Sequence, residues 1–122
     1  MIPFAVYKNI HLIGILMVFL ALGGLLLHRI NGGTKDHSWR KPVAITHGVG
    51  IFLILLGGFG MLARLGIFWA WPGWVTGKVL IWVILGGLIA VIFRKPTLAK
   101  PLWWTTIFLG GLAAYLAGTK PF

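Results

Sequence analysis

The sequence predicts an all-α polytopic membrane protein, a single domain built as an antiparallel bundle of four transmembrane helices. First, 59% of its 122 residues are hydrophobic and only 10% are charged, whereas a soluble protein has roughly a quarter of its residues charged. Second, the apolar residues form four runs, each close to the roughly 20 residues that a helix needs to cross a bilayer. Third, the runs lack the alternating pattern of a transmembrane β-strand, so helices are expected to satisfy the backbone in lipid.

The first span is predicted at about residues 4–28. It is too long for a signal peptide, carries Lys8 and His11 inside its apolar stretch, and has no clear small-x-small cleavage site. We therefore expect it to be retained as a helix. The other three spans are predicted at about residues 43–63, 76–93 and 102–118.

The charge distribution predicts how the chain lies in the membrane. The net charge is +10 and Asp36 is the only acid. Basic residues lie mainly in the connections, which favours contact with anionic lipid headgroups over nucleic acid. Because the first and third connections carry the larger share, the positive-inside rule predicts both termini outside, in the bacterial inner (cytoplasmic) membrane. One side holds Arg29, Lys35, Arg40, Lys41, Arg94, Lys95 and Lys100, and the other holds Lys8, Arg64, Lys78 and Lys120.

Two further patterns concern packing and the membrane interface. The second connection, residues 68–74, is rich in tryptophan, which is typical of an interfacial aromatic belt. Each span also contains a Gly-Gly pair, and small residues let helices approach closely in lipid. The same glycines would also make room for a flat cofactor. For assembly, the sequence leaves open a homodimer through the small-residue faces or a complex with another membrane protein.

Ionisable side chains within or beside the spans are the candidates for function, because they are costly in lipid. Lys8 and His11 are three residues apart and share a helix face, and Lys78 opens the third span on the same side. These three residues are candidates for one outer site. For the two lysines the alternative is snorkelling to the interface, and for His11 it is a hydrogen bond to a neighbouring helix. Arg64 is a further candidate for binding an anionic ligand on this side.

His28 and His47 lie on the other side, and imidazoles from neighbouring helices are common ligands of haem iron. His47 is the better candidate of this pair, because His28 adjoins Arg29 at the boundary of the span. His11 and His28 are about 25 Å apart along a helix, so they cannot bind one iron. The candidate ligands of haem iron are therefore His11 and His47, in separate sites. The sequence has no cysteine, which excludes thiolate metal sites, and a single acid excludes a carboxylate proton relay.

The run Lys8-Asn9-Ile10-His11-Leu12-Ile13-Gly14 and the run Gly77-Lys78-Val79-Leu80 after a Trp-rich stretch resemble the small membrane proteins of the SirB, CopD and HemJ type. The resemblance implies a compact helical membrane protein. In the HemJ group, a protoporphyrinogen oxidase family, the corresponding histidine and lysine are implicated in binding haem b, which carries over to His11 and Lys78. The sequence departs from that group in the apolar residues 82–92, where a further histidine is expected.

The leading functional hypothesis is a membrane protein that binds b-type haem for electron transfer or tetrapyrrole-linked redox chemistry. Its cofactor-binding residues would be His11, His47, Lys78 and His28. The alternative is a cofactor-free accessory subunit or small transporter that binds lipid or an anionic ligand, with Lys8 and Arg64 among the ligand-binding residues.

Overall fold

The chain folds into four long helices. The computed structural model describes residues 2–121. The helices are α1 (Phe4–Ile30), α2 (Arg40–Arg64), α3 (Gly73–Arg94) and α4 (Ala99–Thr119), and a short 3₁₀ turn, η1 (Pro96–Leu98), precedes α4. Each helix covers one of the four predicted spans and extends it by less than one helical turn at either end.

Three of these helices, α1, α2 and α3, are long and apolar enough to cross a membrane, which indicates an integral, multi-pass membrane protein. The fourth helix is 21 residues long, but the tryptophans and threonines at positions 103 to 106 lower its apolarity. Its role as a fourth span therefore stays a prediction.

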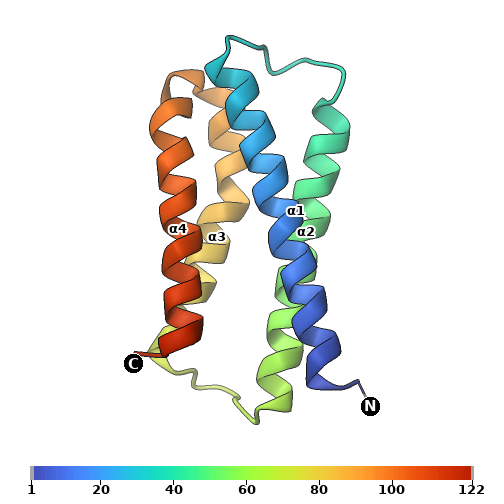
Figure 1. Cartoon of the computed structure of the whole chain (residues 1–122), viewed down its shortest axis with the longest axis vertical. Coiled ribbons are helices and arrows are strands. Elements are labelled where there is room, and N and C mark those ends of the chain that lie inside the picture. The colour runs from blue at the N-terminus through green and yellow to red at the C-terminus, as the bar shows by residue number, and fades with distance from the viewer. Residues whose placement is uncertain (1, 122) are drawn as a thin grey trace.

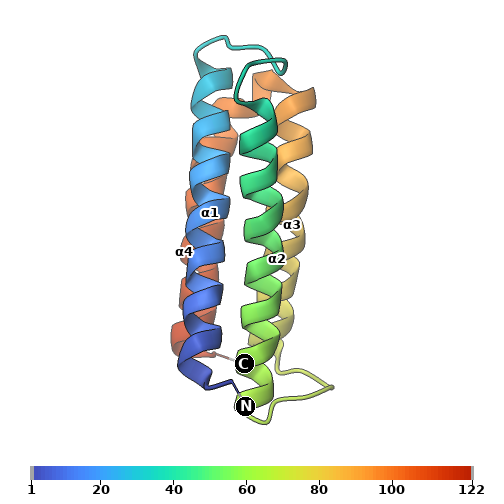
Figure 2. The ribbon, with the colours of Figure 1, turned by 90° about the vertical axis from the view of Figure 1, so that its right-hand side faces the viewer.

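Successive helices run in opposite directions and lie side by side (Figures 1 and 2). Both termini and the connection between α2 and α3 lie at one end of the molecule, which we call the terminal end. The connections between α1 and α2 and between α3 and α4 lie at the other end, which we call the connection end.

The ends of α1 and α2 are set by two glycines in the left-handed region, Gly32 at φ 83° and Gly66 at φ 73°. In α1 the amide of Gly33 donates to the carbonyl of His28 at 2.8 Å, and in α2 the amide of Ile67 donates to that of Leu62 at 2.9 Å. These are Schellman caps, in which glycine adopts the positive φ at little cost. Both caps turn the chain sharply, so each connection begins directly at the helix end.

Helices α1 and α2 pack backbone to backbone through glycine. A Cβ added at Gly14 would lie 2.7 Å from the carbonyl oxygen of Gly50, and one added at Gly50 would lie 2.8 Å from that of Gly14. Likewise, a Cβ at Gly57 would lie 2.6 Å from the amide nitrogen of His11. The close-packing interpretation of the glycines thus describes this pair of helices. It does not describe Gly23, Gly24, Gly87 and Gly111, which have no neighbour within 4 Å of an added Cβ.

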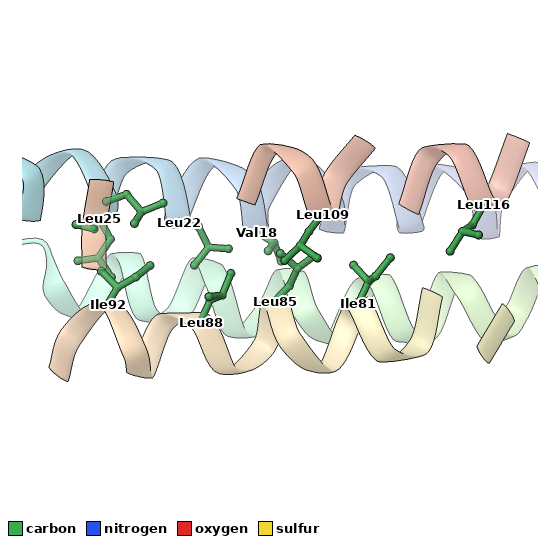
Figure 3. Packing of buried hydrophobic residues seen from close by; sticks show 11 residues of the cluster. Val18, Leu22, Leu25, Ile81, Leu85, Leu88, Ile92, Leu109 and Leu116 are labelled. Atoms are coloured by element: carbon green, nitrogen blue, oxygen red, sulfur yellow. The ribbon is translucent and has the colours of Figure 1, made fainter. Parts of the chain in front are cut away.

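A cluster of aliphatic side chains fills the space between α1, α3 and α4 (Figure 3). Leu22 and Ile92 have no exposed surface, and Leu25 is 1% exposed. Helix α2 contributes only partly buried side chains to the edge of the cluster, such as Ile51 and Ile54. The cluster joins the α1–α2 pair to α3 and α4 mainly over the half of the molecule nearer the connection end.

Arg29 reinforces this joint at the connection end. Its guanidinium donates from Nε to the carbonyl of Ile92 at 3.3 Å and from Nη2 to that of Phe93 at 3.2 Å, and it also reaches the carbonyl of Gly33 at 2.8 Å. The two acceptors in α3 belong to its last turn, where carbonyls have no partner within the helix. Arg29 therefore caps α3 while tying it to the end of α1.

Candidate functional site

A cavity of about 660 Å³ opens between the α1–α2 pair and the α3–α4 pair. Its lining extends from the terminal end to about the middle of each helix, where the aliphatic cluster closes it. Ligand sites commonly have volumes of roughly 300–1,000 Å³ and mostly apolar walls with a few polar groups. The ionisable groups that line this cavity are one imidazole and three ammonium groups, and they belong to Lys8, His11, Lys78 and Lys120.

His11 is held by a hydrogen bond to α2. Its Nδ1 lies 2.9 Å from the carbonyl oxygen of Ile54. A carbonyl oxygen can only accept, so Nδ1 carries the proton and the neutral ring presents Nε2 as an unprotonated nitrogen. Within the described residues 2–121, Nε2 has no hydrogen-bond partner. A histidine whose other nitrogen donates to a backbone carbonyl is the arrangement found for metal-bound imidazoles.

Three lysines surround the same cavity. Lys8 comes from α1, Lys78 from the second turn of α3, and Lys120 from the end of α4. Lys78 is half-buried and lies within electrostatic range of both His11 and Lys120. The single acid of the sequence, Asp36, lies at the connection end, where its carboxylate accepts a hydrogen bond from Arg40 at 2.8 Å. The cavity is thus cationic, with no acidic side chain of the chain to balance it.

The structure therefore places Lys8, His11 and Lys78, the three residues suggested for an outer site, around one cavity. Arg64 ends α2 at the same end of the molecule but does not line the cavity. Lys120 joins the site although the sequence suggested it only as a basic residue. The topology could have indicated Lys120, because an even number of spans brings the C-terminus back to the end of the molecule that contains His11.

His47 lies elsewhere, between α2 and α3. It is buried, and its Nε2 donates to the carbonyl of Leu85 at 3.0 Å. Trp82 makes the reciprocal connection, because its indole Nε1 donates to the carbonyl of Ile51 at 3.0 Å. These two bonds fasten α2 to α3, and His47 does not line the cavity that contains His11.

His28 lies at the connection end. Its Nε2 donates to the carbonyl of Thr34 at 2.8 Å, and its ring packs against that of His37, with centroids 4.2 Å apart. The structure does not bring His28 and His47 together, since their partners lie in different parts of the molecule. Among residues 2–121, no group of three or more His, Cys, Asp or Glu side chains is placed to hold a metal ion.

The Trp-rich connection forms an aromatic cluster at the terminal end. Trp71 packs against Phe59 with centroids 5.6 Å apart and against Trp69 at 5.1 Å. Trp69 is 82% exposed and Phe68 is 67% exposed. Exposed aromatic side chains beside membrane-spanning helices fit the polar–apolar boundary of a bilayer.

Comparisons with protein-family models, with curated proteins and with solved structures find no match for this chain. The resemblance to the SirB, CopD and HemJ type is therefore carried by the residues quoted for it alone, and it stays a prediction.

Proposed function

We propose that this integral membrane protein binds b-type haem in the cavity at its terminal end, with His11 as an iron ligand. The observation that carries the proposal is the state of the His11 ring, whose Nδ1 is fixed by the Ile54 carbonyl and whose Nε2 has no partner within residues 2–121. Neutral imidazole nitrogen of this kind is a common axial ligand of haem iron.

The residues around the cavity fit a tetrapyrrole. The walls are mostly aliphatic and aromatic, as a flat apolar ring requires, and the volume is within the range of cofactor sites. Gly58 faces the His11 ring, and a Cβ added there would lie 3.6 Å from two of the ring atoms. That distance is an ordinary contact, so only a side chain larger than alanine at Gly58 would extend into the space next to the imidazole.

Bound haem b would supply one-electron transfer, and the chain would supply its binding and surroundings. The Ile54 carbonyl orients the imidazole and makes it a stronger electron donor. The aliphatic walls exclude water. Of the four predicted cofactor-binding residues, the geometry favours His11 and Lys78, which line the cavity, over His47 and His28, which do not.

The proposal includes the topology. The four helices would form an antiparallel transmembrane bundle, with both termini outside the bacterial inner membrane and the basic connection end in the cytoplasm. Thirteen of the 21 residues of α4 are hydrophobic, which supports its placement as the fourth span, since an exposed helix of this composition would be costly in water. Assembly as a homodimer or with another membrane protein stays a prediction.

A second candidate function is binding of an anionic lipid or another acidic amphiphile by a cofactor-free accessory or transport protein. The observation that favours it is the cavity's three lysines without an acidic partner. This candidate uses the same cavity but does not need the unprotonated nitrogen of His11.

The test is a visible absorption spectrum of the detergent-purified protein, first oxidised and then reduced with dithionite. We expect a Soret band and, after reduction, sharp α and β bands that the substitution His11→Ala removes. His47→Ala is the matched control, because His47 is also a buried histidine but lies outside the cavity. A colourless protein after expression with a haem supply would refute haem binding and leave the acidic amphiphile as the occupant.

A further inference from the structure

Lys78 is a basic residue in a mostly apolar cavity. It is half-buried on α3 and lines the cavity beside His11. Within the described part of the chain, its ammonium has no hydrogen-bond acceptor and no carboxylate within ion-pair distance. A charge in a membrane-spanning segment is costly and normally pairs with another polar group. Residues 2–121 offer Lys78 no such group.

Lys120 adds a second positive charge next to it. The Lys120 ammonium donates to the carbonyl of Ala117 at 3.0 Å and lies 5.3 Å from the centroid of the Trp74 ring. These two contacts hold Lys120 at the end of α4, where it lines the cavity within electrostatic range of Lys78. Two ammonium groups near each other repel.

An anion would offset both costs, and within the described residues 2–121 the chain provides none at this end. Asp36 is already paired with Arg40 in the first connection, at the opposite end of the molecule. A carboxylate that accepts hydrogen bonds from an ammonium makes short, charge-assisted bonds that are stronger than neutral ones. The lysines and the mostly apolar walls of the cavity together favour a ligand with acidic groups attached to an apolar body.

We propose that Lys78 and Lys120 bind the two propionate carboxylates of haem b and so orient it in the cavity. This inference rests on the proposed function. Two carboxylates would balance two ammonium groups, while the apolar ring would lie against the aliphatic walls. In this arrangement His11 binds the iron and Lys78 is a positioning residue that acts on the edge of the ring. The propionate edge would face the terminal end, because Lys120 lies at that end of the cavity.

The test compares haem with haem dimethyl ester, in which both propionates are esterified and the iron and ring are unchanged. Each is titrated into the apoprotein in a non-ionic detergent, and binding is followed by the Soret band. We expect the wild-type protein to bind haem roughly ten- to a hundred-fold more tightly than the ester, which is the range for losing a hydrogen bond to a charged group. Added salt should weaken binding of haem and leave that of the ester unchanged.

The substitutions Lys78→Gln and Lys120→Gln remove the charge and keep a polar side chain. Each should weaken haem binding by about tenfold or more, leave binding of the ester unchanged, and preserve the His11-dependent spectrum. Lys120 is exposed, so its variant should fold even if the Lys78 variant does not. Lys95→Gln, at the connection end and outside the cavity, is the matched control and should behave like the wild type.

Three results would overturn the assignment. Equal binding of haem and its ester, with an intact His11-dependent spectrum, would refute the carboxylate contacts while the proposed function stands. A change of spin state in Lys78→Gln with the preference for haem retained would make Lys78 an iron ligand instead. Absence of a His11-dependent spectrum with either compound would refute haem binding, and this inference with it.

Discussion

Replacing Gly14 by alanine tests whether direct backbone contact between α1 and α2 stabilises the fold and the site. The new Cβ would lie 2.7 Å from the Gly50 carbonyl oxygen and 2.8 Å from the Ile54 amide nitrogen. Both neighbours are backbone atoms of a helix, so they cannot move away as a flexible side chain can. Restoring an ordinary contact of 3.4 Å requires the two helices to separate by about 0.7 Å. Overpacking of this kind costs about 1–3 kcal/mol.

The same separation should reach His11, which lies one turn away on the same face of α1. Its bond to the Ile54 carbonyl would lengthen from 2.9 Å to about 3.6 Å, which is too long for a hydrogen bond. Gly14→Ala should therefore lower the free energy of unfolding and also weaken the His11-dependent binding of haem.

The measurement is unfolding in mixed detergent micelles followed by tryptophan fluorescence, together with a haem titration. Gly23→Ala is the matched control, because it lies on the same helix and an added Cβ there meets nothing within 4 Å. We expect this control to be as stable as the wild type or slightly more stable. If Gly14→Ala unfolds at the same point as Gly23→Ala, the packing argument is wrong.

Two further predictions concern the other histidines. Substituting His47 by alanine removes its hydrogen bond to the Leu85 carbonyl and should lower the free energy of unfolding by about 1–2 kcal/mol. The spectrum of bound haem should not change. A loss of that spectrum would make His47 an iron ligand. At the connection end, the pKa of His37 is lowered, chiefly by burial and to a smaller extent by the nearby His28, Arg40 and Arg29. Asp36 acts in the opposite direction. Neutral His37 is thus favoured in the folded state, so stability should be full above about pH 6.5 and fall as the pH drops through the lowered pKa. His37→Gln should flatten that pH dependence in the same unfolding assay, and an unchanged slope would show that another group causes it.

The positions of the four long helices could be predicted from the sequence, because the length of an apolar run in lipid is a strong constraint. The predicted topology also places Lys8, His11 and Lys78 at the same end. The rotation of each helix about its axis could not be predicted in this way. Hydropathy is similar all round a helix such as α3, so the pattern of apolar residues does not say which face meets which neighbour.

His47 illustrates this difference. Its position well inside α2 made it a candidate iron ligand, but the ring faces α3 and donates to the Leu85 carbonyl. A backbone carbonyl is available on every residue of every helix, so the sequence carries no signal for such a bond. The glycines show the same difference, since Gly57 is packed tightly against α1 and Gly24 has open space beside it.

The cavity's position along the helices has a consequence for exchange with the surroundings. The half of the molecule near the connection end is filled by the aliphatic cluster and tied by Arg29, so the cavity is closed in that direction. Its occupant therefore cannot be reached from the connection end without separating these helices. Carrying a ligand to the far side would require α3 to part from α1, against the Arg29 bonds and the leucine contacts together.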